Sequence, residues 1–359
     1  MERVRVNLGP RRYDIAVGDR AGLPAFVREV CPYARQFFVA HDAAVTPQAT
    51  AIVTALQAAG WRVGVFAIPS GEASKSLAMT AKLYDALAAL PADRATPVIA
   101  VGGGVTGDLA GFAAATYNRG LPLVMVPTTL LAMVDSSVGG KVGVNHPAGK
   151  NLIGAFHQPA GVWIDPTFFD TLPTREYASG LAEVVKYGVI LDPEFFAFLE
   201  TNAAAILARD PVAVAHVVAR CCRLKADVVE LDEREETGLR AKLNYGHTFA
   251  HAYETVAGYG TWLHGEAVSA GMVAASRLAE RLGRIPASVT ARQHALLTAF
   301  GLPTEPLPAW GLDAQLDVMR RDKKSVGGEL RFVLPTRLGE VEVVEGVPEA
   351  TVREILAGR

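Results

Sequence analysis

The stretch Pro97-Val-Ile-Ala-Val101-Gly102-Gly-Gly104-Val-Thr-Gly107-Asp108 places an apolar run directly before a glycine-rich turn and a helical pattern. It contains G-x-G-x-x-G between a predicted strand and a predicted helix, which is the context that this motif requires. Glycine lets the backbone approach a ligand closely, and the first amides of the helix face an anion. The stretch therefore predicts one strand–turn–helix unit of an α/β fold, with a phosphate-binding loop as its functional interpretation.

The same alternation continues through the first half of the chain. Apolar runs at 37–40, 62–68, 97–101 and 123–126 predict strands, and the segments 47–59 and 77–87 predict helices. We expect Thr46 to be the N-cap of the helix over 47–59. Strand–helix–strand repetition predicts a right-handed, doubly wound and mostly parallel sheet. Residues 1–7 alternate charged and apolar side chains, which is typical of an edge strand.

From Tyr177 onward the apolar spacing becomes helical. Helices are predicted at 181–191, 194–207, 212–230, 248–256 and 267–282, and a small hairpin at 330–334 and 340–344. Pro166 and Pro173 lie in a loop-like stretch that separates the two patterns. We therefore predict two domains: an α/β domain over residues 1–173 and a mainly α-helical domain over residues 174–359.

Composition excludes several classes of protein. The chain has 359 residues, of which 50% are hydrophobic and 20% charged, and its 35 basic and 37 acidic residues nearly cancel. This balance argues against nucleic-acid or membrane partners. There is no apolar signal segment and no uninterrupted apolar run of membrane-spanning length. The 3 cysteines suit neither a disulfide framework nor a zinc ribbon, so we expect reduced thiols in a cytoplasmic protein.

Three of the histidines lie close together, in Asn244-Tyr-Gly-His247-Thr-Phe-Ala-His251 and in His264-Gly-Glu266. His247 and His251 are four residues apart and would share one face of a helix. Neutral imidazole is a common ligand for zinc and related ions. The cluster favours a metal or catalytic site, while a set of hydrogen-bonded core histidines is the alternative.

Polar residues follow several of the predicted strands. Asp42 follows the strand over 37–40, Ser70-Gly-Glu72-Ala-Ser-Lys75 follows that over 62–68, and Thr128-Thr129 follows that over 123–126. Ligands of open parallel sheets bind at the carboxyl ends of strands, so these positions favour a nucleotide role. Each could instead be an ordinary turn residue.

Two further segments carry charges in unusual places. Residues 135–151 contain two lysines and four glycines without a continuous helical or strand pattern, so we predict a functional loop that suits an anionic small molecule. Glu183 and Lys186 lie three apart on an apolar helix, where opposite charges indicate a site. A solvated loop and charges that reach out to solvent are the alternatives.

Five segments in order resemble the 3-dehydroquinate synthase family of sugar-phosphate cyclases: GGGVTGDLAGF from Gly102, VPTTLLAMVDSSVGGKVGVNHPAGKNLIGAFHQP from Val126, LPTREYASGLAEVVKYG from Leu172, LNYGHTFAHA from Leu243 and LHGEAV from Leu263. Asp322-Lys323-Lys324 extends the resemblance. It implies an NAD-binding amino-terminal α/β domain, a metal-binding helical carboxyl-terminal domain and a homodimer. It also implies conversion of 3-deoxy-D-arabino-heptulosonate 7-phosphate to 3-dehydroquinate and phosphate.

The resemblance assigns roles residue by residue. Glu183, His247 and His264 match the ligands of a zinc or cobalt ion. The positions that match NAD contacts are Asp42, Ser70, Gly71, Glu72, Ala73, Ser74, Lys75, Gly104, Val105, Thr106, Gly107, Asp108, Thr128, Thr129, Lys141, Lys150, Phe168, Phe169, Asp170 and Thr171. The catalytic or substrate-side positions are Arg119, Asp135, Lys141, Asn151, Lys186, Lys225, Arg240, Asn244, His251 and Lys324. His251 is the expected proton relay rather than a metal ligand.

One departure and three alternatives accompany this assignment. Asp232-Glu-Arg-Glu-Glu236-Thr-Gly-Leu-Arg240 is one residue longer than the family pattern, which makes Lys225 a weaker match than Arg240. A sister cyclase of valiolone or inosose type would share the fold, NAD and the metal. A metal-dependent polyol dehydrogenase is a more distant alternative, because it gives no reason for the lysine-rich loop. A catalytically silent NAD-binding member is the alternative from another class.

Overall fold

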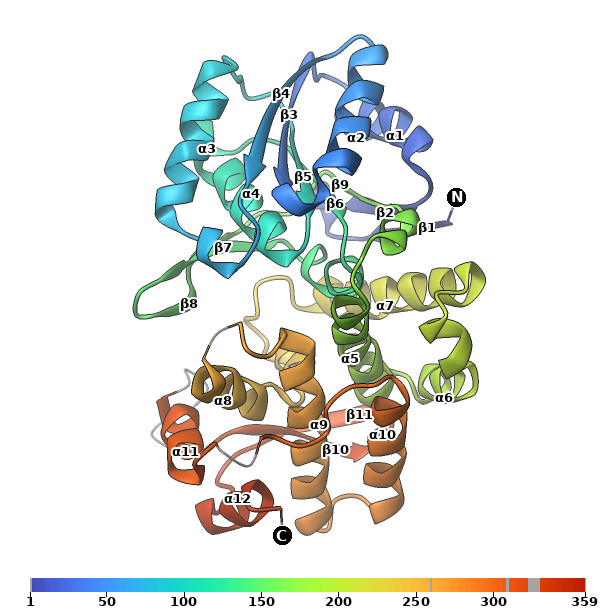
Figure 1. The fold of residues 1–359 in the computed structure, drawn as a ribbon, viewed down its shortest axis with the longest axis vertical. Coiled ribbons are helices and arrows are strands. Elements are labelled where there is room, and N and C mark those ends of the chain that lie inside the picture. The colour runs from blue at the N-terminus through green and yellow to red at the C-terminus, as the bar shows by residue number, and fades with distance from the viewer. Residues whose placement is uncertain (1, 259, 308–309, 322–329, 359) are drawn as a thin grey trace. The chain divides into compact units, whose positions relative to one another are not determined.

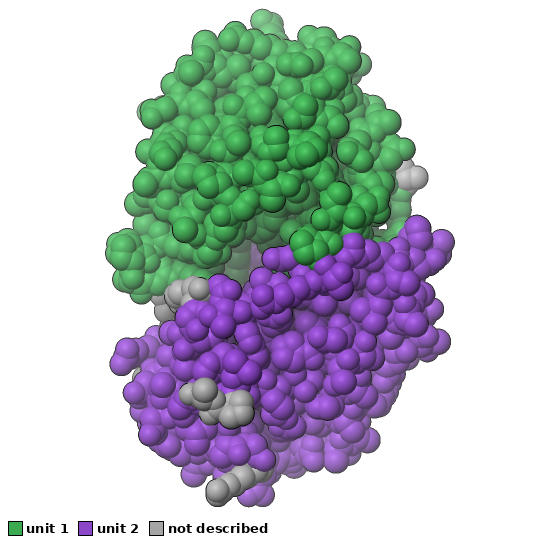
Figure 2. Space-filling model, viewed as in Figure 1, with its two compact units in different colours: residues 1–173, 214–234 green, residues 174–213, 235–359 purple. Residues whose placement is uncertain are grey.

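The fold is known from a computed structural model, which describes residues 2–258, 260–307, 310–321 and 330–358. The chain divides into two compact units, coloured separately in Figure 2. Unit 1 comprises residues 1–173 and 214–234, and unit 2 comprises residues 174–213 and 235–359. Within the described part of the chain, no helix has the length and apolar character needed to cross a membrane.

A seven-stranded sheet forms the centre of unit 1 (Figure 1). Its order is β1-β2-β9-β6-β5-β3-β4, with β1 antiparallel at one edge and the other neighbours parallel. The strands are β1 (Glu2–Val6), β2 (Tyr13–Val17), β3 (Gln36–Asp42), β4 (Arg62–Ile68), β5 (Val98–Gly102), β6 (Leu123–Pro127) and β9 (Gly161–Ile164). The predicted mostly parallel sheet and the predicted edge strand are confirmed, whereas β2 and β9 were not predicted.

The central strands are apolar because both of their faces are covered. Every residue of β5 and β6 is buried, as expected where helices pack on both sides of a parallel sheet. The helices of unit 1 are α1 (Leu23–Val30), α2 (Thr46–Ala58), α3 (Leu77–Ala89), α4 (Gly104–Thr116) and most of α7 (Pro211–Leu231). All three cysteines are free, as the sequence predicted, and all three are buried.

The predicted cap of α2 is wrong in detail. Val45 occupies the N-cap position, and the Thr46 hydroxyl donates to the carbonyl of Ala43. A short turn of helix over Ala43–Val45 precedes α2, and the carboxylate of Asp42 caps that turn by accepting from the amide of Ala44. The chain therefore begins to coil at Ala43, four residues before the predicted first helical residue at 47.

The prediction of an irregular loop over 135–151 is also wrong. β7 (Lys141–His146) and β8 (Gly149–Phe156) form an antiparallel hairpin outside the main sheet. Gly143 pairs with Gly154, and a Cβ at Gly143 would lie 2.6 Å from the carbonyl oxygen of Ile153. Gly143, one of the glycines that looked like loop residues, is therefore required for close backbone approach between two strands.

Unit 2 is helical around α9, as predicted. Its elements are α5 (Thr174–Leu191), α6 (Pro193–Leu207), α8 (His247–Ala257), α9 (His264–Arg281), α10 (Ala287–Ala299), α11 (Leu312–Arg321), α12 (Glu349–Leu356) and the hairpin of β10 (Phe332–Arg337) with β11 (Glu340–Val344). Helix α9 contacts α5, α8, α10 and α12, and most of its residues are buried.

Two glycines let neighbouring helices approach α9 closely. A Cβ at Gly265 would lie 1.8 Å from the carbonyl oxygen of Ser179 on α5, and one at Gly271 would lie 2.3 Å from that of Gly246. The amide of Gly265 donates to the Ser179 hydroxyl at 3.1 Å. These contacts fix the amino-terminal ends of α8 and α9 against their neighbours, beside His247 and His264.

Gly265→Ala should therefore destabilise unit 2, because backbone rather than a flexible side chain occupies the space that the methyl group needs. Overpacking of this kind costs about 1–3 kcal/mol or more. The measurement is urea unfolding, with Gly311→Ala as the matched control, since a Cβ at Gly311 meets nothing within 4 Å. Equal unfolding midpoints for the two variants would contradict the close approach.

Candidate nucleotide loop and metal centre

The carboxyl ends of β5 and β6 position the glycine loop of unit 1. Gly102 ends β5 and α4 begins at Gly104, with Gly103 as an N-cap residue that has no side chain. The amide of Thr128 donates to the carbonyl of Gly102 at 3.0 Å, and a Cβ at Gly103 would lie 3.2 Å from the side chain of Thr129. The first-turn amides of α4 and its dipole suit an anion bound over this loop.

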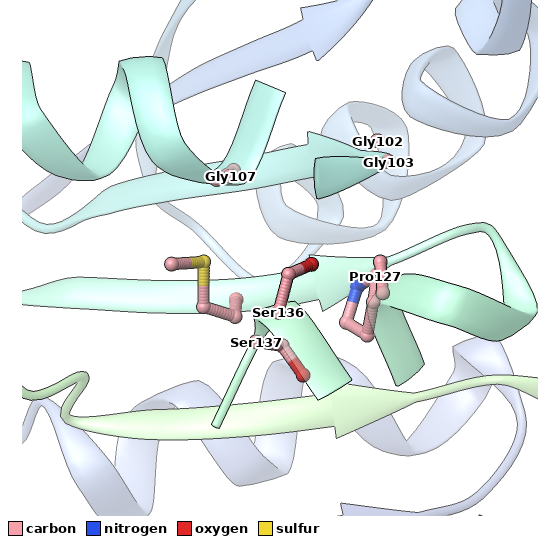
Figure 3. A pocket seen from close by; sticks show the side chains of 9 residues that line it. Gly102, Gly103, Gly107, Pro127, Ser136 and Ser137 are labelled. Atoms are coloured by element: carbon pink, nitrogen blue, oxygen red, sulfur yellow. The ribbon is translucent and has the colours of Figure 1, made fainter. Parts of the chain in front are cut away.

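Figure 3 shows the small cavity behind the loop. Its volume is about 10 Å³, and it is lined by Ala100, Gly102, Gly103, Gly107, Met125, Pro127, Ala132, Ser136 and Ser137. A space of this size holds about one water molecule. The phosphates of a nucleotide would therefore lie over the loop rather than inside this cavity.

The ends of β3 and β4 bring two further predicted nucleotide residues together. The hydroxyl of Ser70 donates to the carboxylate of Asp42, and the amide of Ala44 lies 3.2 Å from that hydroxyl. Segment 70–75 follows β4, which is parallel to β3. Asp42 and this segment thus share the carboxyl edge of the sheet with the glycine loop, where ligands of such sheets bind.

Lys75 connects the β7–β8 hairpin to that edge. Its ammonium group is buried and donates to the carboxylate of Asp108 and to the amide oxygen of Asn151. Burial raises the pKa of Asp108, and the charge of Lys75 acts in the opposite direction. Asn151 adopts a positive φ of 56°. A predicted substrate residue thus lies beside two predicted cofactor residues.

A second ion pair, between a buried lysine and a partly exposed aspartate, joins two predicted substrate residues. The ammonium of Lys225 on α7 donates to the Asp135 carboxylate at 2.7 Å and to its backbone carbonyl at 2.5 Å. The extra residue of this chain lies between Lys225 and Arg240, in the segment where unit 1 ends at Arg234. Lys225 is in α7, before that segment, so the Asp135 contact does not depend on its length.

The other predicted residues are more scattered. Arg119 follows the carboxyl end of α4 and precedes β6, so it lies at the amino-terminal edge of the sheet, away from the glycine loop. Lys141 begins β7 and is exposed, and Lys150 is in β8.

The predicted cofactor segment over 168–171 follows β9. Phe168 and Phe169 are buried, and the Thr171 hydroxyl accepts from Gln48. Lys324 lies outside the described residues.

In unit 2, Glu183, His247 and His264 come together. One donor atom from each of the three side chains lies within 4.8 Å of the others. The Nε2 atoms of His247 and His264 are 3.6 and 3.5 Å from Oε1 of Glu183. Glu183 comes from the middle of α5, whereas the histidines are the first residues of α8 and α9. This is the set that the sequence predicted as metal ligands.

Local structure holds each histidine in place. Gly246, with a left-handed φ of 78°, turns the chain into α8. Nδ1 of His247 lies 3.1 Å from the carbonyl of Tyr245, so a hydrogen bond there directs Nε2 toward Glu183. At the start of α9, Glu266 accepts from the amide of Leu263 at 2.8 Å.

Charged groups other than the three proposed ligands also lie at the metal centre. The Lys186 ammonium pairs with the second oxygen of Glu183, and both side chains are almost fully buried. Although burial opposes the charged form, hydrogen bonds from His264 to Glu183 and Glu254 raise the pKa of His264 to about 10. A buried carboxylate and two imidazoles converging on one point are a donor set that zinc and cobalt(II) accept. The residues therefore fit a divalent ion.

Two other residues of α8 lie near this centre. The His251 ring is 5.8 Å from that of His247, and His251 is outside the three-ligand cluster. Glu254, for which the sequence predicted no role, has its carboxylate 3.4 Å from Nδ1 of His264. The missed signal is spacing, since Glu254 follows His247 by seven residues and therefore falls on the same helical face.

Two predicted substrate residues, Arg240 and Asn244, lie in the short helix that ends before Tyr245. Arg240 is buried at 3% exposure, and its side chain is 3.8 Å from the carboxylate of Glu235.

Comparisons with known proteins identify the family of the chain. The 3-dehydroquinate synthase N-terminal family model matches residues 65–179, and the C-terminal family model matches residues 180–325. A 3-dehydroquinate synthase of Desulforamulus reducens is 49% identical over 99% of this chain and 100% of its own length.

Two solved structures of sugar-phosphate cyclases resemble the fold. The 2-epi-5-epi-valiolone synthase of Streptomyces hygroscopicus, with NAD⁺ and Zn²⁺ bound, is 30% identical with a TM-score of 0.88 over 96% of both chains. A 2-deoxy-scyllo-inosose synthase complexed with carbaglucose-6-phosphate, NAD⁺ and Co²⁺ is 26% identical with a TM-score of 0.90 over 99% of both chains. The chain itself belongs to the 3-dehydroquinate synthase family, as the family models and the full-length identity show.

Metal analysis should separate ligand from neighbour among the histidines. We expect His264→Ala to lose most bound Co²⁺ or Zn²⁺, because one of three converging donors is removed. His251→Ala should retain about one ion per chain, because this side chain is outside the cluster. Equilibrium dialysis followed by elemental analysis makes the measurement. The reverse pattern, with metal lost only from His251→Ala, would overturn the ligand assignment.

Proposed function

We propose that this chain converts 3-deoxy-D-arabino-heptulosonate 7-phosphate to 3-dehydroquinate and phosphate, a step of the shikimate pathway of aromatic amino acid biosynthesis. The observation that carries the proposal is 49% identity to a 3-dehydroquinate synthase over the full length of both chains. The identities to the valiolone and inosose cyclases are lower, at 30% and 26%. The donor set in unit 2 and the glycine loop in unit 1 support the same reaction.

We propose NAD and a zinc or cobalt ion as cofactors. The glycine loop, Asp42 and the segment 70–75 would hold the nucleotide, and Glu183, His247 and His264 would hold the metal. When bound, NAD⁺ would accept and later return a hydride, and the metal would polarise the substrate hydroxyls. These roles correspond to the predicted NAD-binding domain over residues 1–173 and metal-binding domain over residues 174–359.

The chain's own residues would move protons and hold the phosphate. His251 is the proposed proton relay, since imidazole can give or take a proton near neutrality and this ring adjoins the metal cluster. Lys141 and Lys324 are the proposed partners of the leaving phosphate. Lys186 would act differently, because its pairing with Glu183 lets it balance the charge of the ligand carboxylate.

The remaining proposals concern assembly and location. We propose a homodimer, following the family resemblance. We also propose that the protein is located in the cytoplasm, where buried free thiols such as those of this chain persist.

Arg119 is exposed and lies at the sheet edge opposite the glycine loop, where Asn118, Arg119 and Gly120 all have positive φ. If Arg119 serves the phosphate, a second copy of the chain must therefore supply it.

The activity is tested most simply with a limiting cofactor. We expect one phosphate released per heptulosonate phosphate even when NAD⁺ is present at about one-hundredth of the substrate concentration, because the overall conversion is redox-neutral. A colorimetric phosphate assay follows the reaction to completion. Phosphate release with some other sugar phosphate only would favour a sister cyclase, and turnover limited to the amount of NAD⁺ would favour the dehydrogenase.

Lys141→Ala tests the phosphate contact. A charge-assisted hydrogen bond to a phosphate is worth ~1.5–3 kcal/mol, so KM for the substrate should rise about 10- to 100-fold with KM for NAD⁺ little changed. Lys82→Ala is the matched control, since Lys82 is an exposed lysine of α3. If KM for NAD⁺ rises instead, Lys141 belongs to the cofactor site and the phosphate role is wrong.

A further inference from the structure

Glu254 occupies an unusual position for a carboxylate with no assigned role. It lies two turns after His247 on α8, and its side chain is only 9% exposed. Burial of a carboxylate is costly unless a partner compensates for the lost hydration. His264 is such a partner, since its Nδ1 lies 3.4 Å from Oε1 of Glu254.

The His264 ring lies between two carboxylates that face its two nitrogens. Glu183 faces Nε2 at 3.5 Å, and Glu254 faces Nδ1 at 3.4 Å. An imidazole that gives the lone pair of Nε2 to a metal keeps its proton on Nδ1. That N–H would then donate to Glu254, which fixes both the tautomer and the rotation of the ring.

The two histidines of the cluster differ in this respect. His247 has the neutral carbonyl of Tyr245 beside its Nδ1, whereas His264 has the carboxylate of Glu254. A carboxylate partner pulls the N–H proton more strongly than a peptide carbonyl, and it makes the opposite nitrogen a better electron donor. His264 should therefore be the stronger of the two imidazole donors.

We propose that Glu254 is a positioning residue that orients His264 and strengthens its bond to the metal. The inference rests on the proposed metal site and adds to it the origin of the metal affinity. Glu254 contacts the nitrogen that faces away from Glu183, so it acts through His264 and is not itself a ligand.

The test measures Co²⁺ binding to purified metal-free protein by competition with a chromophoric chelator. Loss of an outer partner of this kind typically weakens metal binding ~10- to 100-fold. Glu254→Ala should reach that range. Glu254→Gln, which keeps shape and a neutral acceptor like the Tyr245 carbonyl, should bind more weakly than the parent and more tightly than Glu254→Ala. Glu280→Gln, on α9 and remote in sequence from His264, should bind like the parent.

A double-substitution cycle excludes a merely structural role. In a His264→Ala background, Glu254→Gln should weaken Co²⁺ binding no further, because its effect passes through the removed ring. The visible spectrum of bound Co²⁺ should have the same intensity in Glu254→Gln as in the parent protein, which would indicate that no direct ligand was lost.

Three results would overturn the proposal. Equal Co²⁺ affinities of the parent and both Glu254 variants would remove the role. A change of Co²⁺ coordination in Glu254→Gln would make Glu254 a ligand, and equal losses with and without His264 would make it structural. If the parent protein itself binds no Co²⁺, the proposed metal site is wrong. Failure of the metal site can therefore be distinguished from failure of the role proposed for Glu254.

Discussion

The close approach of α9 to α5 and to the start of α8 is the constraint on which the metal centre depends. Gly265 and Gly271 leave room for the carbonyls of Ser179 and Gly246, which a single methyl group would displace. Gly265 follows His264 directly, and Gly246 directly precedes His247. The glycines thus set how near the two histidines lie to Glu183. Bringing two partly buried imidazoles up to the buried carboxylate of Glu183 costs hydration, which a divalent ion, Lys186 and Glu254 would offset.

Glycines are also important in unit 1, but there they expose backbone amides to a ligand. Its glycines lie where a strand ends and a helix begins, so that backbone amides rather than side chains face an anionic ligand. Lys75 then connects Asp108 at the start of α4 to Asn151 on the β7–β8 hairpin. One buried cation therefore joins three segments that are far apart in the sequence.

Much of the fold could be predicted because the spacing of apolar residues along the chain indicates which side chains are buried. The buried runs of β5 and β6 and the helical spacing of α9 are set by local pattern. β7 and β8 could not be predicted, because their glycines serve a cross-strand contact that local pattern does not contain. The metal cluster was predictable from helical spacing together with a family resemblance. For Glu254, spacing could have indicated the helical face that it shares with His247, but not its contact with His264 on another helix. The position of Arg119 could not be predicted either, because it depends on which edge of the sheet its turn occupies.

The central claim is that one divalent ion is bound by Glu183, His247 and His264. An anomalous difference map from crystals grown with Co²⁺ and NAD⁺, collected at the cobalt edge, tests this most directly. The account predicts one dominant peak in unit 2 within coordination distance of Glu183 Oε1 and of Nε2 of both histidines, about 2.0–2.2 Å. A dominant peak bound by His251, or one on Nδ1 of His264 beside Glu254, would contradict it.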